Sequence, residues 1–160
     1  MLNTLRAAGM AVGLIGLVQS AAAETLRVMH PEPEAPVIVA AGPAGVDSPG
    51  DTRFFHFSGV TDDAVEVVMD WMMTTTGTAT AEGANSRVTQ AVFSVGGPGG
   101  DQIVLMGAGL YPDETNVFPA ASSLVRAIIG GTGAYSDARG VVVSTHEADG
   151  SWVHEFRFAD

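Results

Sequence analysis

The chain has 160 residues, with 18 acidic and seven basic side chains and a formal net charge of −11. This charge repels the phosphates of nucleic acids and of anionic lipids, which excludes both as expected partners. The chain contains no cysteine, so its stability must come from packing and backbone pairing rather than from disulfides.

The first 23 residues have the pattern of a secretory signal peptide. A basic start, "MLNTLR", leads into the apolar run "AAGMAVGLIGLV", and "QSAAA" supplies small residues before Glu24. A membrane anchor is the alternative, but the run is shorter than the roughly 18 residues that a span requires. No cysteine follows for lipid attachment. We therefore expect cleavage after Ala23, no membrane association afterwards, and a periplasmic or secreted protein.

Residues 24–160 are sufficient for a single domain with a hydrophobic core. They consist mostly of short apolar runs separated by turn sequences such as "DSPGD", "TDDA", "GGPGGD" and "EADGS". Only "FPAASSLVRA", residues 118–127, could also be helical. Strands are expected at about 25–30, 36–41, 51–59, 65–75, 86–95, 102–110, 123–129, 139–146 and 152–158. This pattern predicts an all-β meander that closes into a barrel or a sandwich.

The first expected strand leads into "MHPEPEAP", residues 29–36. In an extended chain His30, Glu32 and Glu34 share a face, and a histidine with two carboxylates is one metal-ligand set. The intervening prolines favour a semi-rigid solvated stretch whose acids point to water. We favour the second interpretation and predict no metal site.

Two histidines lie among aromatic residues, His56 in "RFFHF" and His154 in "WVHEF". Each is either a hydrogen-bonded histidine of the interior or an acid or base, because imidazole titrates near neutral pH. Nothing in the sequence marks a Ser-His-Asp triad, and G-x-S-x-G is absent. Both histidines are kept as candidate ligand-binding residues, together with His30.

Alternation is clearest in residues 65–75 and 152–158. In "VEVVMDWMMTT" the odd-numbered apolar residues face one way, and Glu66 and Asp70 face the other. Trp71, among methionines, is either core packing or an adaptable cavity wall for an apolar ligand. In "WVHEFRF" one face carries Trp152, His154, Phe156 and Phe158.

The segment "QIVLMGAGL", residues 102–110, is apolar on both faces. Ile103 and Leu105 point one way, whereas Val104 and Met106 point the other. A barrel strand that is apolar on its outer face usually contacts something besides its own lumen. We therefore expect a homo-oligomer.

The stretch "IIGGTGAYSDARGVVV", residues 128–143, is the most informative part of the chain. It is not a dinucleotide or phosphate loop, because too few residues separate Gly133 from the run beginning at Val141 for a crossover helix of about a dozen residues. The chain also has no lysine for a Walker motif. Arg139 is therefore either paired with Asp137 at the barrel rim or directed into a cavity to polarise a ligand.

The same stretch resembles the dirigent proteins, which form one barrel superfamily with the allene oxide cyclases. "GGTGAYSDARG" is similar to their G-G-T-G-x-[FY]-x-x-A-R-G segment. The resemblance implies an eight-stranded antiparallel closed β-barrel, often trimeric, with a hydrophobic cavity. Such barrels hold reactive intermediates while these couple or cyclise, and they use no cofactor.

The resemblance also assigns residues. Arg139 falls on the family's loop arginine and Tyr135 on its aromatic position. Dirigent proteins have an acid directly after the first-strand histidine, whereas here Pro31 follows His30, so Glu32 is the nearest substitute. The expected catalytic set is Arg139 to stabilise developing negative charge, with Tyr135 or Glu32 to move a proton. The expected ligand-binding set is His30, His56, Trp71, Asp137 and His154.

The function predicted from these observations is binding of a hydrophobic small molecule in the barrel, with cofactor-independent cyclisation or isomerisation as its expected chemistry. A non-catalytic carrier or a structural secreted barrel is the alternative. The two classes differ in whether polar groups converge inside the lumen.

Overall fold

The computed structural model describes residues 25–77, 83–112 and 115–159. The expected signal sequence, 1–23, lies outside the described residues. Within the described residues, no helix is long and apolar enough to cross a membrane. The elements are the strands β1 (Thr25–His30), β2 (Val37–Val39), β3 (Thr52–Thr61), β4 (Glu66–Gly77), β5 (Ala84–Val95), β6 (Asp101–Pro112), β7 (Ser122–Gly131), β8 (Gly140–His146) and β9 (Trp152–Phe158), and one 3₁₀ turn, η1 (Gly133–Tyr135).

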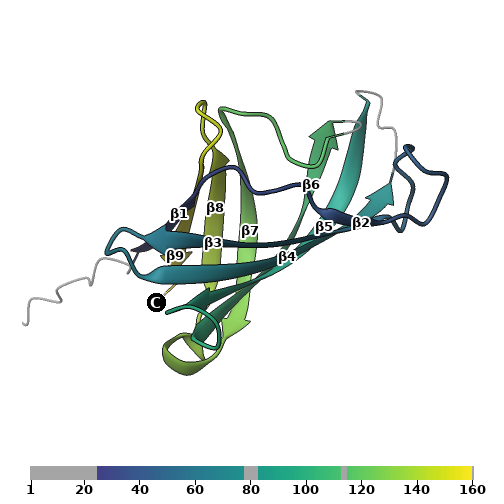
Figure 1. Cartoon of the computed structure of the whole chain (residues 1–160). Coiled ribbons are helices and arrows are strands. Elements are labelled where there is room, and N and C mark those ends of the chain that lie inside the picture. The colour runs from purple at the N-terminus through teal and green to yellow at the C-terminus, as the bar shows by residue number, and fades with distance from the viewer. Residues whose placement is uncertain (1–24, 78–82, 113–114, 160) are drawn as a thin grey trace, which may run out of the picture.

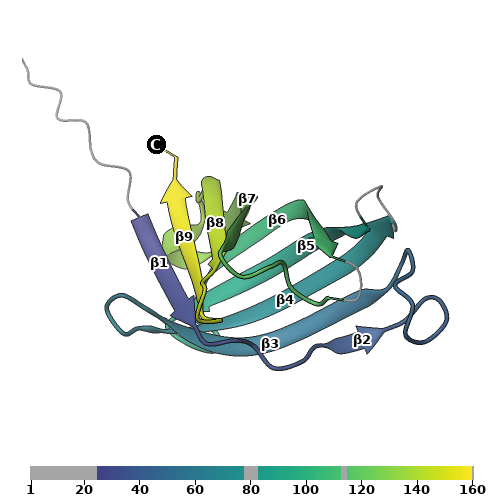
Figure 2. The same ribbon diagram turned by 90° about the horizontal axis from the view of Figure 1, so that it is seen from above.

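The strands form a closed antiparallel barrel. From β3 to β9 each strand pairs with the next one in the chain, and β1 pairs with β9. Two further pairs, Val28 with Thr61 and Met29 with Val60, join β1 to β3 and close the ring of eight. Strand β2 is an additional strand along β3. This confirms the predicted fold, and Figures 1 and 2 show it from two directions.

The interior is filled by the inward positions that alternation predicts. On β4, Val67, Met69, Trp71 and Met73 are all buried, and Trp152, His154 and Phe156 are buried on β9. Val65, expected on the same face, precedes the strand and is 40% exposed. A single hydrophobic core therefore occupies the lumen.

The pairings define two ends of the barrel. At one end, which we call the mouth, β1 ends at His30 opposite Trp152, the first residue of β9, and β8 ends there at His146. At the opposite end, which we call the far end, β8 begins at Gly140 opposite Phe158. The turn η1 lies at the far end, between β7 and β8 (Figure 1).

Residues 118–127 do not form a helix, which was one of the two predictions from their sequence. Strand β7 begins at Ser122, and its burial alternates from exposed Val125 to buried Arg126 and Ile128. Pairing with β8 on one side and β6 on the other supplies the backbone hydrogen bonds of this strand. Tertiary pairing overrides the weak helical propensity of this stretch.

Candidate functional site

A cavity of about 40 Å³ lies in the lumen near the mouth. Aromatic side chains from four elements and one connection make up six of its thirteen lining residues, and polar groups meet them from β1, β6, β7 and β9. A buried water needs roughly 10–15 Å³, so this space fits a few water molecules unless the wall moves. Its lining residues are His30, Pro33, Phe55, Phe57, Trp71, Met73, Tyr111, Asn116, Val117, Phe118, Arg126, Trp152 and His154.

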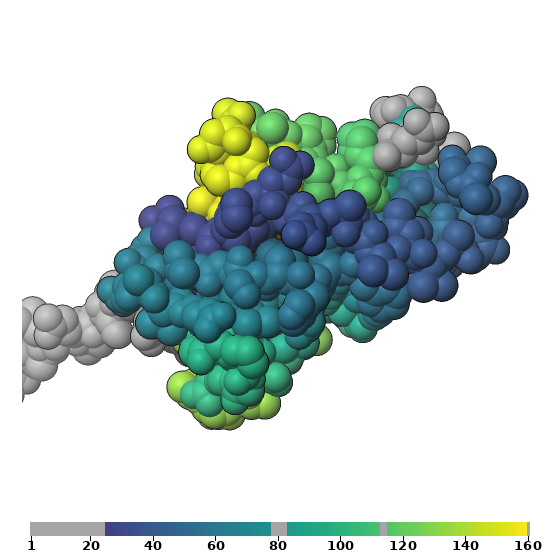
Figure 3. Space-filling model, in the orientation of Figure 1, coloured from purple at the N-terminus to yellow at the C-terminus, as the bar shows by residue number. Residues whose placement is uncertain are grey.

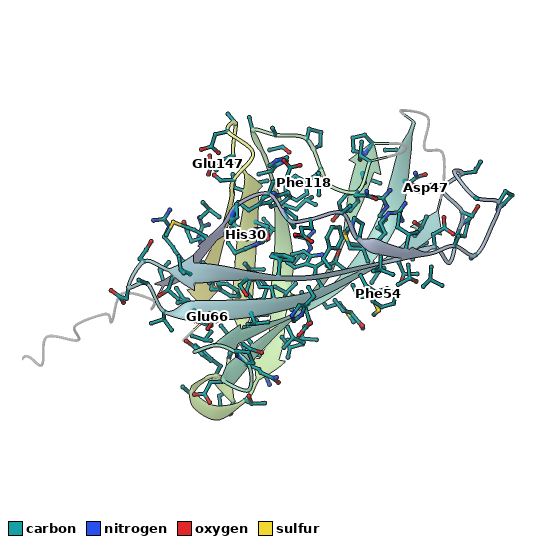
Figure 4. All side chains as sticks on the ribbon, in the orientation of Figure 1. His30, Asp47, Phe54, Glu66, Phe118 and Glu147 are labelled. Atoms are coloured by element: carbon teal, nitrogen blue, oxygen red, sulfur yellow. The ribbon has the colours of Figure 1, made fainter. Side chains whose placement is uncertain are left out.

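Two connections cover the cavity. Pro33 comes from the segment after β1, and Phe118 comes from residues 115–121, before β7. Figure 3 shows the first connection crossing the surface between the C-terminal strands and β3, and Figure 4 shows His30 and Phe118 on the same side of the barrel. The Phe118 ring packs edge-on against Trp152 with centroids 4.7 Å apart, and His146 Nδ1 donates to the Phe118 carbonyl at 2.8 Å. Both the ring and the backbone carbonyl of Phe118 are therefore held in place at the cavity wall.

A chain of hydrogen bonds runs from Ser144 to the mouth. Ser144 Oγ lies 2.8 Å from His154 Nδ1, His154 Nε2 lies 3.0 Å from His30 Nε2, and His30 Nδ1 lies 2.6 Å from the carbonyl of Pro31. Because a carbonyl only accepts, His30 carries its proton on Nδ1, His154 donates from Nε2, and Ser144 donates to His154. In this arrangement each imidazole carries one proton, and the Pro31 carbonyl accepts the hydrogen bond from His30 Nδ1.

Burial sets the protonation of this pair. Desolvation lowers the pKa of His30 to about 4, although the hydrogen bond to Pro31 acts in the opposite direction. Desolvation also lowers the pKa of His154 well below its usual value, and the nearby charges of His30 and Arg126 lower it further. At neutral pH both histidines are therefore uncharged, and burial makes each a weaker base than a free imidazole.

Arg126 brings a guanidinium into the same lumen. Its residue is 2% exposed, its guanidinium carbon lies 4.9 Å from the centroid of the Trp71 ring, and its Nη2 donates to Tyr111 Oη at 2.8 Å. Its Nε and Nη1 make no hydrogen bond among the residues that the structure describes. Such buried unpaired donors are uncommon in folded proteins and point to a missing partner.

A second polar cluster occupies the lumen towards β2, around Asp47 (Figure 4). Arg87 donates to Asp47 at 2.6 Å, Arg53 donates to the other carboxylate oxygen, and Asn85 also donates to Asp47 at 2.7 Å. Burial alone would raise the pKa of Asp47, but the hydrogen bonds and charges of Arg87 and Arg53 lower it below its usual value. Both carboxylate oxygens of Asp47 are paired, and the cluster joins the loop before β3 to β3 and β5, while Arg87 Nε makes no hydrogen bond among the described residues.

Three of the residues expected at the site line the cavity: His30, Trp71 and His154. His56 does not, because it lies on the outer face of β3, where its Nδ1 is 2.7 Å from Asp70. Glu32 is exposed in the connection after β1. The polyproline interpretation of this connection matches the exposure of its acids, and the described residues contain no group of three His, Cys, Asp or Glu able to hold a metal ion.

Arg139, Tyr135 and Asp137 lie at the far end, away from the cavity. Arg139 is exposed, and its Nη1 donates to the Ala138 carbonyl at 2.7 Å. The alternative in which Arg139 is directed into a cavity is wrong because β8 buries its even-numbered residues: Val142 is fully buried, whereas Val141 is 37% exposed. The parity of Arg139 is therefore that of the outer face.

Sequence reasoning missed Arg126, Tyr111 and Phe118. The signal for Arg126 was present, since it shares the parity of Leu124 and Ile128 in "SSLVRAII". An arginine at an inward position of a strand can polarise a ligand in the cavity, which is the role that was expected of Arg139. Phe118 carried no signal, because a loop position has no periodicity.

A larger hollow, of about 670 Å³, lies outside the barrel on the sheet of β3 to β6. Its lining includes Phe54, Met72, Val92, Val104 and Ile129. Its wall is mostly apolar and also carries exposed polar groups such as the His56–Asp70 pair, whereas the lumenal cavity combines aromatic walls with buried polar groups. The convergence of chemistry therefore favours the cavity as the candidate ligand site.

No protein-family model matches the chain, and no curated protein matches its sequence. A solved structure described as a pyocyanin demethylase has a similar fold, with a TM-score of 0.58. The two chains share 19% sequence identity, and the match covers 85% of this chain and 98% of the other. At that identity the similarity establishes the barrel fold and leaves the activity to be argued from the site.

Proposed function

We propose that the barrel binds a hydrophobic, ring-bearing small molecule in the cavity at its mouth, and that the Phe118 ring moves aside to make room for it. The observation that carries this proposal is the meeting of aromatic walls with buried polar groups that have no partner. Trp152 Nε1, like two donors of Arg126, makes no hydrogen bond among the described residues. Three of the five buried side-chain atoms without a partner among the described residues belong to these two cavity-lining residues, so a ligand that supplies acceptors there would be stabilised.

The proposal includes proton transfer without a cofactor, as in a cyclase or isomerase. His30 lines the cavity, and its hydrogen-bonded neighbour His154 can accept or release a proton along the chain that ends at Ser144. The dirigent-like loop supports this class by resemblance, and the similar fold of a pyocyanin demethylase supports an enzymatic role for such a barrel. A non-catalytic carrier is the alternative, and it would bind the molecule without changing it.

We also propose that residues 1–23 direct export, which would place the barrel in the periplasm or outside the cell. The test is N-terminal sequencing of the protein recovered from its natural source. A mature chain that begins at Glu24 is expected, and a chain that retains the apolar run would contradict export by cleavage.

The two tryptophans of the chain provide a direct binding test, because both Trp71 and Trp152 line the cavity. Protein labelled with ¹⁵N is titrated with 2-naphthamide, a neutral aromatic probe, while the two indole N–H signals are followed. We expect both signals to move together and to saturate. Trp152 is decisive because it borders the cavity but not the outer hollow. An unchanged Trp152 signal at saturating probe would refute lumenal binding.

The carrier and the enzyme are then separated by His154→Phe, which keeps a ring in the wall and interrupts the proton path. A carrier variant retains its affinity for every molecule that the wild-type protein binds. An enzyme variant retains binding but loses turnover of a molecule that the wild-type protein converts. Product analysis by mass spectrometry, with and without protein, supplies the second readout.

A further inference from the structure

Arg126 is the buried arginine that has no carboxylate partner in the part of the chain that the structure describes. Among the described residues three arginines are buried: Arg53, Arg87 and Arg126. The first two share Asp47, whereas no acidic oxygen of the described residues lies within ion-pair distance of the third. A desolvated guanidinium without a counter-ion is unfavourable, so an anion that enters beside it would be stabilised.

The surroundings of Arg126 hold its guanidinium in place. It lies over the Trp71 ring, donates to Tyr111 Oη, and has its stem against Gly107, where a Cβ would approach Arg126 Cγ to 2.8 Å. The Tyr111 ring is in turn covered by the guanidinium of Arg87, at 4.8 Å from the ring centroid. The lack of a side chain at Gly107 therefore gives Arg126 room to cross the lumen, and its position is fixed before any ligand arrives.

Donors for an oxyanion are concentrated at this point. Arg126 Nε and Nη1 are unpaired. Tyr111 Oη accepts from Arg126 Nη2, and no acceptor for its own hydrogen is found among the described contacts. Both residues line the cavity, so a carboxylate there would find charged and neutral donors beside aromatic walls.

We propose that Arg126 and Tyr111 form an oxyanion-binding subsite and that the ligand is an aromatic carboxylic acid. Its ring packs against Trp71 and the other aromatic walls, and its carboxylate accepts hydrogen bonds from the unpaired nitrogens of Arg126 and from the Tyr111 hydroxyl. This inference rests on the proposed function and adds the chemical class of the ligand. It also accounts for a buried cation in a chain whose net charge is strongly negative.

The test compares 2-naphthoate with 2-naphthamide, which share a ring system and differ in charge. Dissociation constants are measured at pH 7 from the indole N–H signals of Trp71 and Trp152. We expect 2-naphthoate to bind at least about tenfold more tightly than 2-naphthamide, as a charge-assisted contact in a desolvated site would give. Arg126→Met, which keeps an unbranched apolar stem, should remove this preference while 2-naphthamide still binds.

Two further variants keep the test decisive. Tyr111→Phe removes only the hydroxyl and should weaken 2-naphthoate binding selectively, which covers the case in which Arg126→Met does not fold. Arg157→Met removes an exposed arginine on the outer face of β9 and should leave the preference unchanged.

The outcomes separate this inference from the proposed function. Equal affinities of the wild-type protein for the two probes would overturn the oxyanion subsite and leave lumenal binding standing, with Arg126 solvated by water. The same holds if Arg126→Met and Tyr111→Phe both retain the preference. If neither 2-naphthoate nor 2-naphthamide binds, both proposals are overturned.

Discussion

His154 Nε2 donates a hydrogen bond to His30 Nε2 over 3.0 Å, and both imidazoles lie inside the barrel on adjacent strands. The bond requires one bare nitrogen, so protonation of His30 at Nε2 would place two N–H groups against each other. Burial adds to this cost, since it disfavours the charged form of each ring. The pair therefore links the stability of the mouth to pH.

We predict that acid destabilises the fold through these two histidines. Their pKa values are lowered in the folded state, to about 4 for His30, so the unfolded chain binds more protons once the pH falls below about 6.5. Stability should be unaffected by them above that pH and should fall by about 1.4 kcal/mol per pH unit for each histidine below it. Urea unfolding at pH 7, 6.5, 6, 5.5 and 5 measures this slope.

The matched variant is His154→Phe, which removes one titrating ring and keeps its volume. Its slope between pH 6.5 and 5 should be about half that of the wild-type protein. The window stops at pH 5 because carboxylates with lowered pKa values, such as Asp47 and Asp51, contribute to acid unfolding below it. Parallel slopes in the two proteins would show that His154 does not contribute.

Asp47 is predicted to be the most sensitive acidic residue of the fold. Asp47→Asn leaves the buried guanidinium groups of Arg53 and Arg87 close together without their shared negative charge. We expect a loss of about 3–5 kcal/mol in the free energy of unfolding, measured by urea denaturation. Asp62→Asn breaks the exposed pair with Arg27 and should cost less than about 1 kcal/mol. Equal losses in the two variants would contradict the assigned role of the Asp47 cluster.

Phe118 is predicted to limit the size of the cavity. Phe118→Ala removes the ring that packs on Trp152 and should cost about 3 kcal/mol in stability. It should also tighten binding of 2-naphthamide, because the probe no longer has to displace the Phe118 ring. Phe156→Ala provides the control: Phe156 is equally buried but does not line the cavity, so it should lose stability without gaining affinity. Unchanged affinity in Phe118→Ala would mean that the ligand enters elsewhere.

Arg139 is predicted to be dispensable for lumenal binding, contrary to what the loop resemblance implies. It is exposed at the far end, and its own contact is with the adjacent carbonyl of Ala138. Arg139→Leu should leave the affinity for 2-naphthamide unchanged and alter stability by no more than about 0.5 kcal/mol. A large loss of binding by a folded variant would place the glycine loop in the site after all.

The strands could be predicted well from the sequence because alternation and turn chemistry agree. Every expected strand lies within about two residues of an observed one, and β1 and β9 match at both ends. Closure of the barrel depends on contacts between the first strand and β3, which local patterns do not encode. In this case the family resemblance supplied the number of strands.

The candidate site was predicted less well, for a physical reason that β8 illustrates. In "GVVVSTH" three consecutive valines provide no polar contrast, so the sequence fits either face inward, and the side of Arg139 could not be assigned. The clearer alternation of 152–158 placed His154 and Trp152 correctly inside the lumen. The histidine pair itself joins residues 124 positions apart, which only the fold brings together.

The outer face of β3 to β6 predicts self-association. Val104 and Ile129 line a hollow of about 670 Å³, and Phe54 beside them is 43% exposed, so no element of the described residues covers this largely apolar surface. A stable interface buries roughly 800 Å² on each partner. The simplest partner with a matching apolar surface is a second copy of this chain. We expect an oligomer, and the family resemblance implies a trimer. The measurement is light scattering coupled to size-exclusion chromatography at about 50 µM protein, a concentration at which weak contacts persist. Val104→Glu should dissociate it, whereas Val141→Glu, on the outer side of β8, should not. A monomeric wild-type protein at that concentration would contradict the prediction, because the outer face of β3 to β6 would then not mediate self-association.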